Sequence, residues 1–377
     1  MRKIQRPGVE LLLSVLFLFL TIFLFAPCAA PFVNGIASVA AKAYETRLPF
    51  ALRNGGAENP SNRVKSETTP EKEKDKDAMS ASFETPGDVL RMQADFRKKH
   101  QNASPSGAVK ERYYTTDGAT DLIGDVAVKN ATETKKPDFS ALLNAGPVYR
   151  TMKNGAPLVL VFHTHTTEAY LPTDDGVIYE DCKTRSEEPS ESVVRVGDVL
   201  CAALEKNGIG TIHDTEIYDK AYNGAYDRSR RNVEAYLKEY PSVQIVLDVH
   251  RDAINNADGS KCKPTAVVDC RKAAQVMIIT GAQEGVVDDF PGWEENLRFA
   301  LCLQKKAQER FNGLMRPLYF CPRKYNMDLT PCSLLLEFGS EANTLEEALY
   351  AGHLMGQVIF AAVKEAGEGI TENETGY

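Results

Sequence analysis

Four short, mostly apolar runs constrain the fold of this chain more than any other feature of its sequence. They cover residues 157–162, 243–249, 274–280 and 333–336. Each run has the length of a β-strand and lacks a regular alternation with polar residues. This pattern is typical of strands that are buried on both sides of a parallel sheet.

Segments with helical spacing of apolar residues separate these runs. We expect helices over 192–206, 228–239, 293–311 and 344–365, and a weak strand over 209–213. Because strands that alternate with helices are typical of βαβ units, the sequence predicts an α/β fold with a mostly parallel central sheet flanked by helices.

Composition and charge exclude several other classes of protein. Hydrophobic residues make up 43% of the 377 residues and charged residues 25%, values that exclude a fully disordered or coiled-coil body. The formal net charge is −8, whereas nucleic-acid-binding proteins typically carry an excess of basic residues. We therefore expect no nucleic-acid partner.

The N-terminus has the pattern of an export signal. An apolar run over 11–26 follows the basic residues Arg2, Lys3 and Arg6. The apolar stretch extends to roughly 20 residues, which is enough to span a bilayer, and a basic segment before such a run stays in the cytoplasm. We therefore expect residues 1–40 to be a retained membrane anchor with the rest of the chain outside. The alternative is a cleaved signal peptide.

The next stretch has the composition of a linker. Residues 54–80 are rich in Asn, Ser, Pro, Lys and Glu, and the run EKEKDKD at 71–77 contains no apolar residue. Such a segment cannot bury a core. We expect residues 41–150 to form a flexible, poorly ordered linker or stalk with a short helix near 88–99, and residues 151–377 to form the catalytic domain.

Ionisable side chains follow three of the predicted strands. His163 to Glu168 follow the first run, His250 to Asp252 follow the second, and Glu337 closes the last. Ligands of open α/β sheets bind outside the carboxyl ends of the strands. We therefore expect these side chains to converge on one crevice.

The residue types in this crevice suit a zinc ion. His165 and Glu168 lie three residues apart on one turn, and His250 adds a third ligand from a separate element. Catalytic zinc sites take three protein ligands and leave the fourth position to water. Glu337 is then available as a general base and as the proton donor to a leaving nitrogen.

Two nearby residues have alternative interpretations. If the strand continues past residue 162, His163 lies on the same side as His165 and could replace it as a ligand or support the ligands from behind. Arg251 either holds a substrate carboxylate or pairs with Asp252. Several tyrosines around one helix are interpreted as packing residues: Tyr222, Tyr226, Tyr236 and Tyr240.

Several segments taken together resemble the stage II sporulation protein P family, the engulfment peptidoglycan hydrolases of endospore-forming bacteria. These segments are HTHTTEAYLP (163–172), VVRVGDVL (193–200), YNGAYDRSR (222–230), YPSVQIVLDVHRDA (240–253), WEENLRFAL (293–301) and YNMDLTPCSLLLEFGSEANTLEEAL (325–349). The resemblance covers roughly 156 to 366, together with the order of anchor, linker and C-terminal domain.

The resemblance implies a function and a site. The family is similar to zinc-dependent N-acetylmuramoyl-L-alanine amidases, which implies an amidase-like α/β fold with zinc on His165 (or His163), Glu168 and His250, and Glu337 as the catalytic carboxylate. In those amidases the ligand Glu lies nearer the next helix, where this chain offers alternatives to Glu168: Glu187, Glu188 and Glu191. His163, Arg251 and Asn326 are the residues expected to contact or position substrate.

The implied reaction is hydrolysis of the amide between N-acetylmuramic acid and L-alanine, with endopeptidase cleavage of peptide cross-links as a further activity. The implied partners are peptidoglycan and the sporulation stage II proteins D and M, of which protein D would next cut the stripped glycan strands. The alternative function is a non-catalytic wall-binding scaffold that recruits a partner hydrolase.

Overall fold

The computed structural model describes residues 83–149 and 155–373. The expected anchor over 1–40 and residues 41–82 of the expected linker lie outside this part. Within it, no helix has both the length and the apolar character needed to cross a membrane. In chain order the elements are α4 (Gly87–His100), β1 (Gly107–Arg112), β2 (Asp121–Ile123), β3 (Val126–Asn130), α5 (Phe139–Ala145), β4 (Pro157–Phe162), β5 (Val177–Ile178), η2 (Pro189–Glu191), α6 (Val193–Lys206), β6 (Gly210–His213), α7 (Ala225–Glu239), β7 (Ile245–Asp252), β8 (Lys261–Val268), β9 (Arg271–Ala274), β10 (Val276–Gly281), α8 (Trp293–Arg310), β11 (Leu318–Cys321), β12 (Cys332–Ser340) and α9 (Leu345–Asn373).

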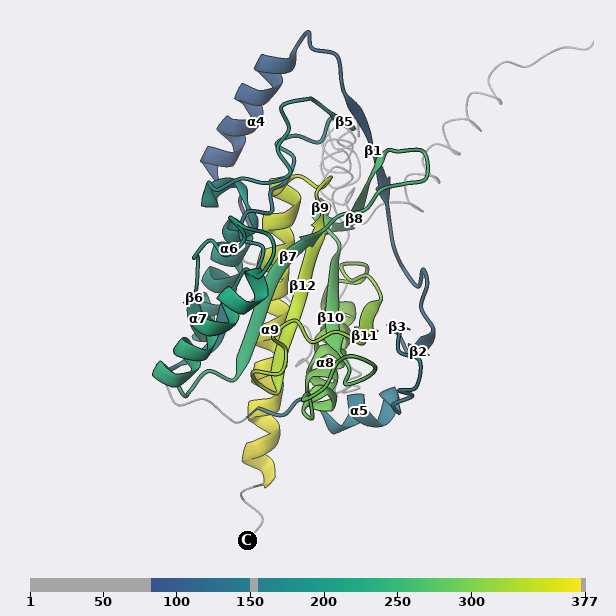
Figure 1. The fold of residues 1–377 in the computed structure, drawn as a ribbon, viewed down its shortest axis with the longest axis vertical. Helices are drawn as coiled ribbons and strands as arrows, with labels where there is room; N and C mark the ends of the chain where they lie inside the picture. The colour runs from purple at the N-terminus through teal and green to yellow at the C-terminus, as the bar shows by residue number, and fades with distance from the viewer. Residues whose placement is uncertain (1–82, 150–154, 374–377) are drawn as a thin grey trace, which may run out of the picture. The chain divides into compact units, whose positions relative to one another are not determined.

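The main sheet has eight strands in the order β2-β3-β11-β10-β12-β7-β4-β6. Its neighbours are parallel except at β10–β12 and at the β2–β3 edge. A smaller sheet has the order β5-β1-β8-β9. Helices flank the main sheet (Figure 1), so the predicted α/β class with a mostly parallel central sheet is confirmed.

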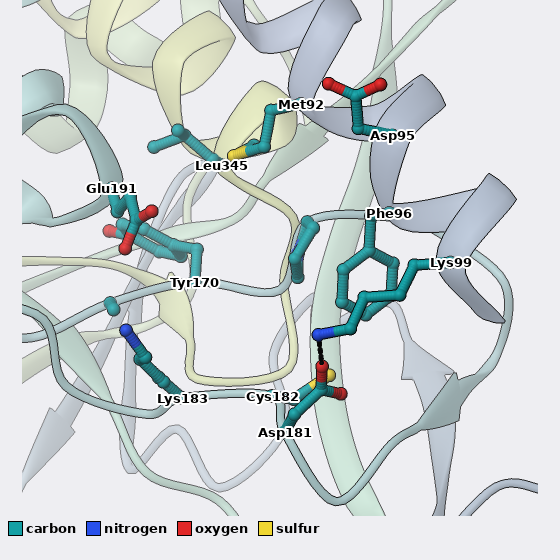
Figure 2. Close-up of a pocket in the computed structure, with 12 residues that line it drawn as sticks. Met92, Asp95, Phe96, Lys99, Tyr170, Asp181, Cys182, Lys183, Glu191 and Leu345 are labelled. Carbon is teal, nitrogen blue, oxygen red and sulfur yellow. Dashed lines mark hydrogen bonds and ion pairs between the residues drawn. The ribbon is translucent and has the colours of Figure 1, made fainter.

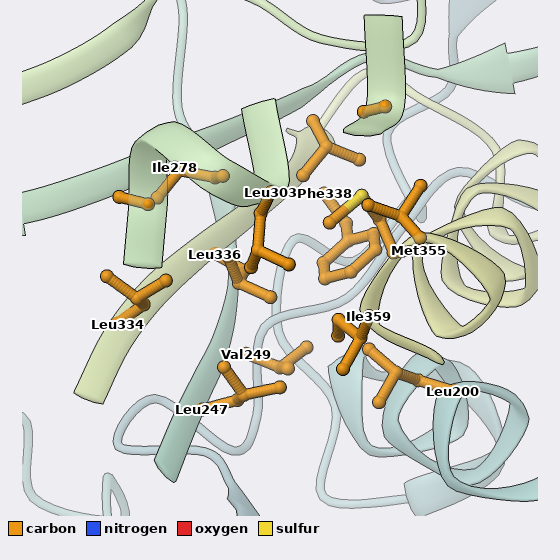
Figure 3. Packing of buried hydrophobic residues seen from close by; sticks show 14 of the residues in the cluster. Leu200, Leu247, Val249, Ile278, Leu303, Leu334, Leu336, Phe338, Met355 and Ile359 are labelled. Carbon is orange, nitrogen blue, oxygen red and sulfur yellow. The ribbon is translucent and has the colours of Figure 1, made fainter. Parts of the chain in front are cut away.

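The two faces of the main sheet carry different helices. Residues of β7 such as Leu247 and Val249 pack with Leu336 of β12 into the large core under α6, α8 and α9 (Figure 3). Val246 of β7 instead packs with Phe162 and with residues of α7. Because successive side chains of a strand point to opposite faces, the alternate residues Asp248 and His250 lie on the α7 face.

Most elements predicted from the apolar pattern are present. Strand β4 and helices α6 and α8 match their predicted ranges to within a residue or two. Ser192 caps α6, because its side chain accepts from the backbone N–H of Val194, in keeping with the preference for Ser at N-caps.

Residues 83–149 differ from the expectation of a poorly ordered linker. The short helix predicted near 88–99 is present as α4, but β1 also pairs with β8 and β3 pairs with β11. This stretch therefore adds strands to both sheets. The strand β1 (GAVKER) is mostly exposed and therefore does not need an apolar run. It can be recognised as a strand only from its pairing with β8, which is distant in the sequence.

Candidate metal centre

Three side chains meet where β4 ends beside β7. His165 and Glu168 belong to the turn after β4, and His250 belongs to β7. His165 Nδ1 lies 3.5 Å from Glu168 Oε1, and His250 Nδ1 lies 3.4 Å from Glu168 Oε2. One ligand atom from each residue lies within 4.8 Å of the other two. The convergence that strand ends predict is therefore present for these three residues.

The spacing of these atoms suits a tetrahedral ion. Two ligand atoms that each lie about 2 Å from zinc are about 3.3 Å apart at the tetrahedral angle. The contacts of 3.5 and 3.4 Å involve different oxygens of Glu168, and one ligand atom from each of the three residues lies within 4.8 Å of the others, which leaves room for an ion between them. Two imidazoles and one carboxylate are also the donor set of many catalytic zinc sites, so the residues present fit this metal.

The electrostatics of the cluster favour a positive charge at its centre. Burial alone would raise the pKa of Glu168, but its contacts with His165 and His250 lower that pKa. Burial would lower the pKa of His250, but Asp248 and Glu168 raise it. The carboxylate neighbours of His250 thus favour a positive charge at this imidazole. A bound cation would supply such a charge, as in other metal sites.

Glu337 lies next to this cluster on the neighbouring strand. It is the register partner of His250 between the parallel strands β12 and β7, so both side chains are on the same sheet face. Burial raises the pKa of Glu337 to about 8. Its Oε2 atom is buried without a hydrogen-bond partner among the described residues. A buried carboxylate oxygen without a partner is costly and suggests a site that awaits a water molecule or a substrate group.

His163 is turned away from the cluster. Its Nδ1 lies 2.9 Å from the carbonyl oxygen of Val249, its Nε2 lies 2.9 Å from Nε2 of His213, and the residue is fully buried. Both ring nitrogens are therefore occupied. The structure does not support His163 as a substrate contact or as a replacement for His165, because its ring is enclosed on the inner side of the strand.

Arg251 forms no ion pair with Asp252 and reaches only the backbone carbonyl oxygen of that residue, at 3.4 Å. Its side chain donates to the backbone carbonyls of Ala169 and Thr184, at 3.1 and 2.5 Å. Asp252 instead pairs with Arg316 at 2.9 Å. The backbone N–H of Arg251 donates to Glu168 Oε2 at 3.0 Å. Arg251 therefore holds the segment that carries Glu168.

Asn326 is also engaged within the protein. Its Nδ2 donates to the carbonyl oxygen of Tyr226 and to Ser229 Oγ, at 3.0 and 3.2 Å. It has a left-handed backbone with a φ of 59°, a conformation that asparagine tolerates better than most residues. The structure thus assigns Asn326 to the attachment of its loop to α7, where we had expected a substrate contact.

The alternative glutamates lie outside the cluster. Glu191 accepts from Ser186 Oγ at 2.7 Å, and Glu187 lies 4.0 Å from Lys220 Nζ. Of the acidic residues weighed as the carboxylate ligand, only Glu168 shares the cluster with His165 and His250.

Sequence reasoning missed two aromatic neighbours of the cluster. The ring of Tyr222 stacks on His165 at 4.8 Å, and Tyr226 contacts the same imidazole edge-on at 5.6 Å. Tyr222 is nevertheless 62% exposed, so it forms a wall of the site that solvent can reach. The positions of these tyrosines in the sequence, before and within α7, do not predict that two of them contact a histidine in the turn after β4.

A separate cavity of about 380 Å³ lies behind the segment that carries Glu168. Met92 and Phe96 of α4 line one side, and Tyr170 and Leu345 line another (Figure 2). None of the three clustered residues lines this cavity. It exists because α4 packs against this part of the protein, so the stretch before residue 150 builds part of the surface near the site.

A second acidic group is already neutralised by lysines. Glu111, Asp174 and Glu347 come close enough to hold an ion. The buried ammonium of Lys263 lies 2.8 Å from Glu111 and 2.9 Å from Glu347 and also pairs with Asp174. We interpret this group as a structural charge network, because the lysine occupies the position of a cation.

Fold and site together define an α/β protein with a His–Glu–His metal-type centre at the ends of parallel strands. The chain belongs to the stage II sporulation protein P (SpoIIP) family, whose family model matches residues 42–360. Stage II sporulation protein P of Bacillus subtilis (strain 168) is 32% identical over 213 residues, which are 53% of this chain and 50% of that protein. The chain thus matches about half the length of this curated relative.

Solved amidases are similar to the chain in outline. The amidase AmiC2 of Nostoc punctiforme matches with 13% identity over 57% of this chain and 98% of its own, at a TM-score of 0.33. The CwlD amidase of Clostridioides difficile, solved in complex with the GerS lipoprotein, matches with 12% identity over 55% of this chain and 97% of its own, at a TM-score of 0.34.

Proposed function

We propose that this protein is a zinc-dependent N-acetylmuramoyl-L-alanine amidase that hydrolyses peptidoglycan during engulfment. The observation that carries this proposal is the buried, unpartnered carboxylate oxygen of Glu337 beside the cluster of His165, Glu168 and His250. Family membership supports the link to sporulation, and the donor set of the cluster supports amide hydrolysis.

Each residue of the site has a distinct chemical task in this proposal. His165, Glu168 and His250 would hold the zinc ion, which supplies an activated water and polarises the scissile carbonyl. A cation in the cluster would lower the pKa that burial raises, so that the Glu337 carboxylate accepts a proton from the attacking water and delivers it to the nitrogen as the amide C–N bond breaks. The exposed ring of Tyr222 borders the cluster and offers an apolar surface to the substrate.

Product analysis tests the reaction and its metal dependence. We expect the full chain to release peptides with a free L-alanine amino group from purified sacculi and to leave glycan strands without peptides. Excess chelator should abolish this release, and added zinc should restore it. Release that continues in excess chelator would reject the metal-dependent mechanism, and intact stem peptides cut only at cross-links would indicate an endopeptidase instead.

We also propose that the protein stays anchored in the cell membrane through residues 1–40, with its catalytic part outside the cytoplasm. The apolar run over 11–26 and its basic flank support this. Sizing the mature protein from membranes should show the full chain. A mature form shortened by about 30 residues, the length of an export signal, would refute retention.

The partners that we propose act on the same polymer. Sporulation stage II proteins D and M would assemble with this protein, and protein D would cut the glycan strands whose peptides have been removed. We expect protein D to release fragments faster from sacculi treated with this protein than from untreated sacculi. Equal rates would argue against this order of action.

A further inference from the structure

We propose that Asp248 is a positioning residue that determines which ring nitrogen of His250 faces the metal centre. Asp248 Oδ1 lies 2.8 Å from His250 Nε2, on the side of the ring opposite the contact between Nδ1 and Glu168. This is an ion-pair distance, and in the present geometry Nε2 has no hydrogen-bond partner among the described residues. The carboxylate favours the proton on Nε2 and leaves the lone pair of Nδ1 for a metal ion.

Asp248 itself is held by a second set of bonds. Its two carboxylate oxygens accept from the backbone N–H and the hydroxyl of Thr164, at 2.8 and 2.7 Å. Asp248 is 1% exposed and Thr164 is fully buried. A carboxylate fixed at this depth cannot rotate away from His250 without losing bonds that no solvent would replace.

The bonds continue from Thr164 to α7 and to the loop before β12. Thr164 Oγ1 lies 2.9 Å from Ser229 Oγ, and Asn326 Nδ2 donates to the same hydroxyl at 3.2 Å. This series of buried hydrogen bonds therefore joins β7, the turn after β4, α7 and the 322–331 loop. Asn326, which we had expected to position substrate, takes part in this support of His250 through Ser229 and Thr164.

The inference rests on the proposed metal centre, but it can fail while that centre stands. The protein also contains a matched control. Asp219 accepts from the backbone N–H and the hydroxyl of Thr167 at 3.1 and 2.7 Å, and its side chain is fully buried. This arrangement repeats that of Asp248 with Thr164, but Asp219 pairs with Arg185 and not with a histidine of the cluster.

The experiment compares zinc binding by the full chain with Asp248→Asn and with Asp219→Asn. Zinc dissociation constants are measured by competition with a chromophoric chelator, below the thermal unfolding temperature of each variant. We expect Asp248→Asn to weaken zinc binding about 10- to 100-fold, as for other residues that orient metal ligands. Asp219→Asn should stay within about threefold of the wild type, because it removes similar structural bonds without touching His250, and its partner Arg185 approaches Glu168 only to 3.9 Å.

The outcomes separate this inference from the proposed function. Equal loss in both variants, or unchanged zinc binding in Asp248→Asn, would overturn the positioning role while the metal centre remains. A wild-type chain that binds no zinc would overturn both. If Asp248→Asn does not fold, Thr164→Val takes its place. It removes one bond to Asp248, so weaker zinc binding supports the inference and unchanged binding overturns it.

The protonation of the ring gives an independent readout. In the zinc-loaded wild type, nitrogen-15 NMR of the imidazoles should show His250 protonated at Nε2 with Nδ1 shifted by the metal. A signal with the roles of the two nitrogens exchanged would contradict the proposal, because the carboxylate of Asp248 would then face an unprotonated nitrogen.

Discussion

At the scale of single residues, strand register places the groups of the proposed reaction. Glu337 and His250 are far apart in sequence, but they are register partners in adjacent parallel strands, whose backbones lie about 4.8 Å apart. The side chain of Glu337 is therefore held beside the cluster by backbone hydrogen bonds of the sheet. This arrangement does not depend on loops, as suits the proton transfer that we propose for Glu337.

Replacing Glu337 by glutamine tests this role. We expect Glu337→Gln to lower the rate of peptide release by about 10²–10⁴, because the amide cannot accept a proton, and to leave zinc content unchanged. Glu341→Gln, just beyond β12, is the control and should keep nearly full activity. If Glu337→Gln supports engulfment as well as the wild type, the non-catalytic scaffold becomes the better description.

At the scale of elements, close packing of helix α6 encloses His163. Gly197 of α6 has no room for a side chain, since an added Cβ would lie 2.5 Å from His213 Nε2 and 2.8 Å from His163 Nε2. The contact between His163 and His213 thus depends on a glycine at this helical position. The apolar spacing of VVRVGDVL predicts a helix from sequence alone. The requirement for glycine at position 197 cannot be predicted in this way, because it depends on His163 and His213.

We expect Gly197→Ala to lower the free energy of unfolding by about 1–3 kcal/mol, because the added methyl group overpacks a buried site. Gly87→Ala is the control. Gly87 begins α4, and a Cβ there would make only an ordinary contact of 3.6 Å with Arg91, so the change should be within about 0.5 kcal/mol. Denaturant unfolding of both variants measures the difference. Equal stability of the two would mean that α6 shifts to make room.

At the scale of the whole described part, a buried lysine joins the smaller sheet to other elements. Lys263 of β8 pairs with Glu111 of β1, with Asp174 and with Glu347 of α9, and its side chain is 1% exposed. Lys272 pairs with the two partly exposed carboxylates of the same set, Glu111 and Asp174, but is itself 44% exposed. The first lysine should matter far more for stability than the second.

Lys263→Met should destabilise the protein by about 3–5 kcal/mol, because it leaves carboxylates near a buried site without their counter-charge. Lys272→Met should cost at most about 1 kcal/mol, as expected for an exposed pair. Urea unfolding at neutral pH compares the two variants. Similar losses in both would contradict the interpretation of Lys263 as the centre of the network.

The effect of Lys263→Met should also depend on pH. Burial alone would raise the pKa of Glu111 and of Asp174, but the two lysines outweigh burial and lower both pKa values. Lowered carboxyl pKa values stabilise the fold above the unfolded-state pKa of about 4, and this contribution is lost as the pH falls below it. The difference between wild type and variant should therefore be largest above about pH 5 and shrink toward pH 3. A difference that grows on acidification would refute this account.

Much of the sheet could be predicted because strands buried on both faces appear in the sequence as continuous apolar runs. The runs that became β4, β7, β10 and β12 are apolar, since both of their faces are largely covered. Strands β1 and β8 could not be predicted in the same way. The strand β1 is mostly exposed, and β8 carries Lys263 at a buried position, where only the carboxylates of other elements make a lysine tolerable.

The sequence by itself determined the α/β class and the three places where ionisable side chains follow buried strands, because the apolar period and the ends of the runs are local properties. Only the tertiary structure decided between the alternatives that the sequence left open. It turned His163 inward, engaged Arg251 and Asn326 within the protein, and brought Asp248 behind His250. Such choices depend on strand register and on partners far away in the chain, and no local pattern of residues encodes them.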